Sequence, residues 1–393
     1  MIEPKIRFKG FEGEWKAPLF SEMVERISAS GQAGMLPGVE FEDIASGEGC
    51  FNKNIYQKEC HKYGKLFYEG DILFGKLRPY LKNIILADFN GVAIGDFWVL
   101  RSKGLDEKYL YTLVNSESFL KVANISSGSK MPRADWNLVS TTKFVVPSAK
   151  DEQKAIGKYF TTLDSQISAS TSRLASLKQM KAASLQAMFP QEGETVPKIR
   201  FKEFEGEWKK VKLSEILTER HENSTITDGL PQLSFTIADG VIRPEDRKSN
   251  KRDFLIKDID NKRYLVTKVG DIIYNPANVV YGAIHRNSLM NGVVSPIYKI
   301  FTTMQDSNFI ECAVRRPSFI TKLAMCTEGT VTKLKTLKPE AFLNMVVCIT
   351  PSLEEQKLIG NYFTSLDRQI SLQSQRLEKL KQIKSACLDK MFV

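Results

Sequence analysis

The chain has 393 residues, of which 42% are hydrophobic and 26% charged, a composition typical of globular proteins rather than disordered ones. Its formal net charge of +10 at pH 7 favours a polyanionic partner. No apolar run reaches the roughly 18 residues of a membrane span, and the N-terminus lacks the apolar core of a signal peptide, so we expect a cytoplasmic protein with no membrane association.

Two segments of the chain occur twice in almost the same form. PKIRFKGFEGEWK at 4–16 returns as PKIRFKEFEGEWK at 197–209, identical at 12 of 13 positions. EQKAIGKYFTTLDSQIS at 152–168 returns as EQKLIGNYFTSLDRQIS at 355–371. The inserts between these copies hardly resemble each other. A repeated frame around two divergent inserts predicts one scaffold that presents two different surfaces.

The inserts mix short β-rich runs with helical ones, so we predict that they share an α+β fold. We expect strands at 143–148 and 345–352, and helices at 114–125 and 311–326. The predicted fold class is α+β, with two similar globular α/β domains held apart by two long helices that form an antiparallel intramolecular coiled coil, a pseudo-twofold internal repeat. The expected order is a leader at 1–16, a first domain at 17–150, a long helix at 151–189, a linker and second leader at 190–209, a second domain at 210–352 and a second long helix at 353–393.

The long helical segments carry apolar residues on alternating steps of three and four, which is typical of a coiled-coil seam. Because the two seams match position for position, we expect the helices to pack on each other. The alternative is two ordinary amphipathic helices that each pack on their own domain. The predicted seam residues are Ile156, Phe160, Leu163, Ile167, Leu174, Leu177 and Met188, and Ile359, Phe363, Leu366, Ile370, Leu377, Leu380 and Met391.

Familiar catalytic motifs are missing from the sequence. It has no GxxxxGK[ST] phosphate loop and no GxGxxG after a strand, and its three histidines lack the spacing of metal ligands. The six cysteines include no CxxC pair, so we expect reduced thiols and no metal site. YNPAN at 274–278 is only superficially similar to the Asn-Pro-Pro-aromatic motif of amino-methyltransferases, because it lacks the second proline. We therefore expect a binding protein with no cofactor of its own.

Candidate DNA-contacting residues lie at corresponding places in the two inserts. Strand alternation over 72–82 would place Lys76, Arg78, Tyr80 and Lys82 on one face, although Pro79 limits how far the strand can run, so part of this segment is a loop. Arg78 would read a guanine edge and Lys82 would hold a phosphate. The loops at 128–135 and 329–336 combine glycine, hydroxyl and basic residues that suit phosphate contacts. Solvated edges or plain turns are the alternatives. The candidates are Lys76, Arg78, Tyr80, Lys82, Ser129, Lys130 and Arg133 in the first insert, and Asn275, Asn278, Tyr281, His285, Arg286, Thr330, Lys333 and Lys335 in the second.

The order of these parts resembles the specificity subunit of type I restriction-modification systems, over essentially the whole chain. The resemblance is carried by PSAKDEQKAIGKYFTTLDSQI and PSLEEQKLIGNYFTSLDRQI, and by the PKIRF…GEW and GDILFGKLRP segments. It implies two target recognition domains, each of which reads one half of a split double-stranded DNA sequence.

The resemblance further implies that this chain is not catalytic. It implies assembly with two modification subunits, which use S-adenosylmethionine, and two restriction subunits, which use ATP and Mg. Two other readings stay open. A self-contained DNA adenine methyltransferase is opposed by the missing methyl-donor motif, and a non-specific DNA-binding coiled-coil scaffold would show no preference among sequences.

Overall fold

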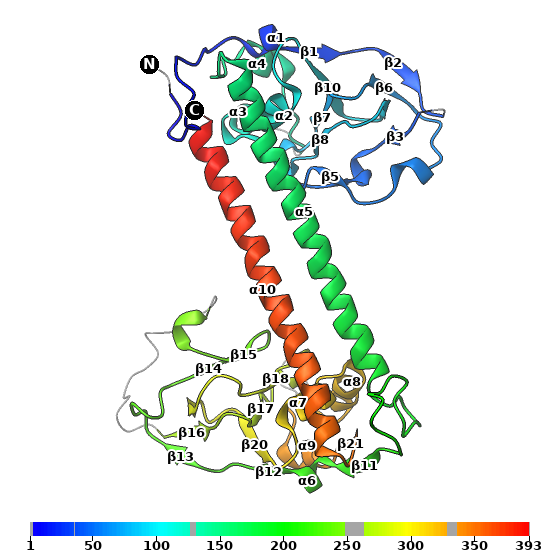
Figure 1. Ribbon diagram of the computed structural model, residues 1–393, viewed down its shortest axis with the longest axis vertical. Coiled ribbons are helices and arrows are strands. Elements are labelled where there is room, and N and C mark those ends of the chain that lie inside the picture. The colour runs from blue at the N-terminus through cyan, green and yellow to red at the C-terminus, as the bar shows by residue number, and fades with distance from the viewer. Residues whose placement is uncertain (1–2, 35, 126–130, 248–262, 328–335, 393) are drawn as a thin grey trace. The chain divides into compact units, whose positions relative to one another are not determined.

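The computed structural model of the chain describes residues 3–34, 36–125, 131–247, 263–327 and 336–392, and they form two compact units. Unit 1 comprises residues 1–174 and 373–393, and unit 2 comprises residues 175–372. The two long helices are α5 (Lys150–Ala187) and α10 (Leu353–Met391). Each is divided between the two units. In unit 1 the N-terminal leader runs beside the end of α10, where the backbone N–H of Ile6 donates to the carbonyl of Lys390 (Figure 1).

Unit 1 is built on an antiparallel sheet whose inner strands are buried on both faces. Trp98 and Leu100 of one strand point into the core that includes the start of α5, whereas Phe97 and Val99 point into a second core on the other face. A strand buried on both faces reads as a continuous apolar run, as FWVL does here. In order across the sheet, the strands are β1 (Val24–Ile27), β10 (Phe97–Ser102), β7 (Ile72–Gly75) and β8 (Ile84–Leu86).

The remaining elements of unit 1 cover this sheet. A second sheet has the order β2 (Ser30–Gln32), β6 (Tyr63–Phe67), β9 (Gly91–Ala93) and β3 (Gly38–Val39), and β4 (Ile44–Ala45) pairs with β5 (Cys50–Phe51). The short helices are α1 (Phe20–Met23), α2 (Glu107–Asn115), α3 (Glu117–Ala123) and α4 (Trp136–Thr141).

Unit 2 repeats the central sheet in the same strand order. Ile272 and Tyr274 face the core that contains the start of α10, and Ile273 faces the opposite core. The sheet has the order β12 (Leu217–Glu219), β20 (Lys299–Thr303), β17 (Ile272–Tyr274) and β18 (Ile284–Arg286). The shared order confirms the prediction that the two inserts have one fold despite their different sequences.

The other elements of unit 2 form smaller sheets and helices. One sheet has the order β13 (Asn223–Ser224), β16 (Tyr264–Thr267) and β19 (Gly292–Val294), and two pairs are β14 (Ser234–Thr236) with β15 (Gly240–Ile242) and β11 (Lys209–Lys212) with β21 (Val346–Ile349). The helices are α6 (Leu213–Ile216), α7 (Ser307–Val314), α8 (Pro317–Met325) and α9 (Pro339–Leu343).

Several local predictions need correction. The helix expected at 114–125 is broken at Ser116, whose hydroxyl accepts a hydrogen bond from the backbone N–H of Phe119 and so starts a second helix. The helix expected at 311–326 is broken before Pro317, because proline is accommodated at the start of a helix and not inside it. The strand expected at 143–148 is reduced to isolated bridges at Lys143 and Val146.

The two repeated segments contact each other inside each unit. In unit 1 the guanidinium of Arg7 donates from Nε and Nη2 to the two carboxylate oxygens of Glu152, at 2.7 and 2.8 Å. In unit 2 Arg200 engages Glu355 in the same way, at 2.7 and 2.9 Å. The glutamate side chains are 1% and 0% exposed. Each leader therefore supplies the counter-ion that the start of a long helix needs in order to be buried.

The glutamine next to each of these glutamates contacts the start of a shorter helix. The side-chain oxygen of Gln153 accepts a hydrogen bond from the backbone N–H of Asp106, the residue that caps α2. Gln356 does the same for Asp306, the cap of α7. The EQK motif thus joins the long helix to both the leader and the helix that follows the central sheet.

The long helices pack antiparallel, as predicted, within each unit. In unit 1 Lys384 of α10 lies 2.5 Å from Asp164 of α5, and Gln373 donates to the carbonyl of Ser170. In unit 2 Lys181 of α5 lies 2.5 Å from Asp367 of α10. All the predicted seam residues are buried or half-buried.

The first turns of each long helix also pack on their own insert, as the alternative interpretation proposed. Ile156 and Phe160 belong to the core that contains the central sheet of unit 1, and Ile359 and Phe363 belong to the corresponding core of unit 2. The seam is therefore shared between helix–helix packing and insert packing.

We predict that Gly157→Ala destabilises unit 1. A methyl group there would lie 2.6 Å from the backbone nitrogen of Tyr109, so α5 would have to move away from α2. This overpacking should lower the free energy of unfolding by about 1–3 kcal/mol, more than the ~1 kcal/mol by which alanine favours a helix over glycine. Ser168→Ala, at an exposed position of α5, is the control and should change stability by less than about 0.5 kcal/mol. Denaturant unfolding measures both, and a Gly157→Ala protein as stable as the control would contradict the contact.

Candidate nucleic-acid interface

The first candidate segment folds into a tight loop. β7 ends at Gly75, residues Pro79–Leu81 form a 3-10 turn, and β8 begins at Ile84. Pro79 fixes its own φ and has no N–H for a strand ladder, so the chain turns there. The strand therefore ends at Gly75, and the part of this segment that was expected to be a loop begins at residue 76.

The candidate side chains of this loop differ in exposure. Arg78, Tyr80 and Lys82 are exposed, whereas Lys76 is half-buried. Arg78 and Lys82 have φ values of 50° and 52°, in the left-handed region that non-glycine residues seldom occupy. Such backbone strain is often found where a loop serves binding.

The second candidate segment lies directly against the first. The backbone N–H of Arg78 donates to the carbonyl of Pro132 at 2.8 Å, and that of Ala134 donates to the carbonyl of Lys76 at 2.8 Å. Arg133 of this segment is 56% exposed. Ser129 and Lys130 lie outside the described residues, as do Thr330, Lys333 and Lys335 of unit 2. The structure thus brings Lys76, Arg78 and Arg133 into one place.

Asp96, just before β10, joins the two segments and was missed from the sequence. Its carboxylate lies 3.2 Å from Nζ of Lys76 and 3.0 Å from Nη2 of Arg133. Burial alone would raise the pKa of Asp96, but hydrogen bonds from Arg133 and Lys76 hold that pKa below its ordinary value. The carboxylate is therefore ionised at neutral pH. No sequence motif marks it, because its partners are 20 and 37 residues away.

The corresponding loop of unit 2 keeps the backbone and changes the side chains. Asn275 donates its backbone N–H to the carbonyl of Ala283, as Gly75 does to Asn83. Leu337 donates to the carbonyl of Pro276, as Ala134 does to Lys76. The candidate side chains here are Asn275 and Asn278, which are half-buried, and Tyr281, which is 64% exposed.

His285 and Arg286 are not available for DNA contact in this structure. His285 is 5% exposed, its Nε2 lies 2.8 Å from the carbonyl oxygen of Ile237, and its Nδ1 lies 3.5 Å from Glu311. Nε of Arg286 lies 3.8 Å from the same carboxylate, and its side chain is 14% exposed. Burial would raise the pKa of Glu311, but His285 and Arg315 lower it, so the carboxylate stays charged and holds both residues inward.

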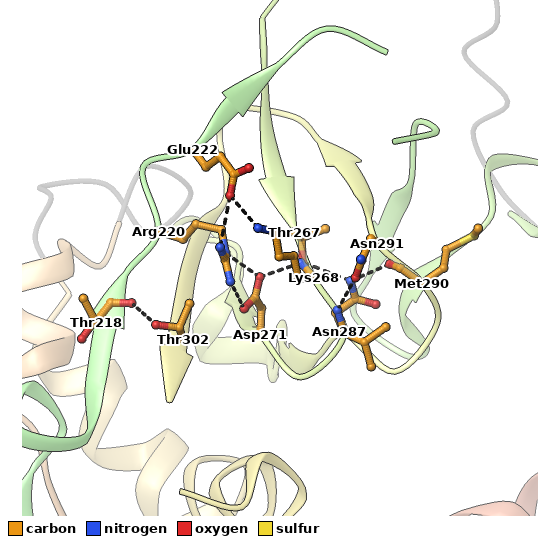
Figure 2. Close-up of polar contacts among 11 residues, drawn as sticks. Thr218, Arg220, Glu222, Thr267, Lys268, Asp271, Asn287, Met290, Asn291 and Thr302 are labelled. Carbon is orange, nitrogen blue, oxygen red and sulfur yellow. Dashed lines mark hydrogen bonds and ion pairs between the residues drawn. The ribbon is translucent and has the colours of Figure 1, made fainter. Parts of the chain in front are cut away.

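A polar network beside the central sheet of unit 2 is part of the framework (Figure 2). Arg220 donates from Nε and Nη2 to both oxygens of Asp271, each at 2.9 Å, and Glu222 lies 3.2 Å from Arg220 and 3.1 Å from Lys268. The hydrogen bond to Asp271 raises the pKa of Arg220. Every charge in this network has a partner, so we assign it a role in holding the turn before β17.

Other sites are not found in the part of the chain that the structure describes. No three His, Cys, Asp or Glu side chains are grouped there so as to hold a metal ion. None of the described helices is both long and apolar enough to cross a membrane. All six cysteines are outside disulfides.

Among known proteins, the chain is similar to specificity subunits of type I restriction enzymes. A family model described as type I restriction modification DNA specificity domain matches residues 205–382. The MjaVIII type I restriction enzyme specificity subunit of Methanocaldococcus jannaschii is 24% identical over 311 residues, 74% of this chain and 70% of that protein. The EcoDI type I restriction enzyme specificity subunit of Escherichia coli is 25% identical over 120 residues, 29% of this chain and 27% of that protein.

A solved structure has the same fold. The S subunit of a type I restriction-modification system from M. genitalium matches with a TM-score of 0.65 and 13% identity, covering 100% of this chain and 99% of that one. At this identity the likeness concerns the fold alone.

We predict that His285→Ala acts on stability and Tyr281→Ala does not. Removing His285 takes one partner from the half-buried Glu311 carboxylate, which keeps Arg315, and removes the hydrogen bond at the Ile237 carbonyl. This loss should lower the free energy of unfolding by about 1–3 kcal/mol. Tyr281 is exposed, so its removal should leave the unfolding midpoint unchanged. Denaturant unfolding of the two variants tests this, and equal stabilities would contradict the structural role of His285.

Proposed function

We propose that this chain is a specificity subunit of a type I restriction-modification system, the subunit that reads the DNA target of such a system. Each unit reads one half of a split double-stranded sequence. The net charge of +10 supports binding to the phosphate backbone.

One observation carries this proposal, namely that the same loop backbone presents different side chains in the two units. The loop hydrogen bonds at 75–83 recur at 275–283. Yet Lys76 corresponds to Pro276, and Lys82 corresponds to Gly282. Base edges are distinguished by the donors and acceptors that face them, so two half-sites of different sequence require two sets of side chains on one scaffold.

We further propose that the chemistry is done by partner subunits. The chain would assemble with two modification subunits that use S-adenosylmethionine, and with two restriction subunits that use ATP and Mg. The sequence has no methyl-donor loop, which disfavours a self-contained methyltransferase. The two different loop surfaces disfavour a scaffold that binds all DNA alike.

The test is to exchange one insert. The chain is co-expressed with its modification subunit, and modified positions in the host genome are mapped by single-molecule sequencing. Replacing residues 17–146 with the insert of a relative should change one half of the modified sequence and leave the other half and the spacing intact, since the loops of each unit are held by contacts within that unit.

The matched control replaces residues 210–350 and should change only the other half. If a single exchange alters both halves, the units do not read independently. If no split sequence is modified with the unaltered chain, the proposed function is wrong.

A further inference from the structure

We propose that Arg133, held by Asp96, reads a guanine in the half-site bound by unit 1, and that Asp96 is the residue that positions it. This inference rests on the proposed function and names the residue that sets part of the specificity. Neither the family model nor the repeat assigns a role to this pair.

The geometry of the pair leaves one end of the guanidinium free. Oδ2 of Asp96 accepts from Nε of Arg133 at 3.4 Å and from Nη2 at 3.0 Å, which occupies the Nε edge of the fork. Nη1 keeps both of its protons, and Nη2 keeps one. Two donors at the end of a rigid fork match the O6 and N7 acceptors of guanine in the major groove.

The carboxylate argues for a base edge over a phosphate. Asp96 already offsets one of the two positive charges beside it, so it would weaken the attraction between Arg133 and the negative charge of a phosphate. A base edge carries no such charge, and the N4 amino group of cytosine can donate to a carboxylate. Arginine and aspartate side by side are therefore complementary to both members of a G·C pair. Lys76, 3.2 Å from Oδ1 of Asp96, keeps the net charge of the trio at +1.

Comparison with unit 2 shows that Asp96, Lys76 and Arg133 are not part of the framework that the two units share. Strand register aligns Leu100 with Phe301, since each pairs with the first residue of β7 or β17, so Asp96 corresponds to Ile297. The backbone hydrogen bonds align Lys76 with Pro276 and Arg133 with Thr336. All three charges are thus replaced together in unit 2.

Framework ion pairs behave differently. The Arg7–Glu152 pair recurs as Arg200–Glu355. Asp271 has the same place before its strand as Asp71, and both receive a guanidinium. All three charged residues are replaced in unit 2 although the loop backbone is retained. This is expected of residues that set specificity, whereas residues that hold the fold together would be retained.

Arg78 is the competing candidate for base reading, and the structure favours Arg133. The side chain of Arg78 is exposed and has no carboxylate partner among the described residues. Ordering a free arginine on binding costs conformational entropy, whereas Arg133 is already held. A mobile cation suits the phosphate backbone, where position matters less.

The experiment uses the full chain assembled with its modification subunit and a library of random DNA duplexes at physiological salt. Bound duplexes are sequenced for the wild type, Arg133→Lys, Asp96→Asn and Arg78→Ala. We expect the wild type to select a G·C pair in the half-site of unit 1. Arg133→Lys keeps the charge and loses the fork, so the preference for that guanine should fall roughly 5- to 150-fold, with all other positions unchanged.

The other variants separate positioning from charge. Asp96→Asn should weaken the same single preference while raising affinity for all sequences, because one negative charge is removed. Arg78→Ala, the matched control, should lower affinity for all sequences and leave the selected sequence unaltered. Retained selection of the unit 2 half-site in every variant shows that the chain is folded.

Two outcomes would overturn the inference. In one, Arg133→Lys selects the same sequences as the wild type. In the other, Arg78→Ala abolishes the preference for the guanine and Arg133→Lys does not. A wild-type complex that selects no sequence would instead refute the proposed function itself.

Discussion

The buried ion pair between each leader and each long helix is the interaction on which the rest of the fold depends. A carboxylate that is 0–1% exposed is very costly unless it is paired, and Arg7 and Arg200 provide that pairing with two hydrogen bonds each. Such pairs add little net stability over apolar residues, but only one arrangement satisfies them. Because the pair occurs in both units, it fixes how leader, long helix and insert meet in the same way twice.

Around that fixed point the inserts differ even in which strand supplies the partner of a corresponding side chain. The aspartate before each inner strand illustrates this, since Asp71 receives Arg101 from β10 and Asp271 receives Arg220 from just after β12. Corresponding carboxylates in the two units therefore receive their arginine from different parts of the sheet. The central sheet tolerates such exchange because both of its faces are buried in apolar cores, so its order is set by packing and not by any single polar contact.

The sequence predicted best what depends on local periodicity. The long helices follow from their heptads, and the duplication follows from comparison of the chain with itself. Pro79 indicated that part of 72–82 is a loop, but alternation says nothing of where a ladder ends, so the end of the strand at Gly75 could not be predicted. His285 was assigned to the surface because its burial depends on Glu311 of α7, 26 residues away, and Asp96 was overlooked for the same reason. Polar residues acquire their roles from tertiary partners, which no period in the sequence reveals.

The loops that present the candidate side chains are positioned by backbone hydrogen bonds, so one scaffold can present two different sets of side chains. The bonds between 76–78 and 132–134 involve no side chain, so substitution of the candidate residues leaves the loop in place. Position 82 shows the limit of this freedom. Unit 2 places Gly282 in the left-handed conformation, whereas unit 1 retains Lys82 at a cost of about 1–2 kcal/mol. Folding alone would favour glycine at both places, so the stability of the loop does not account for the lysine.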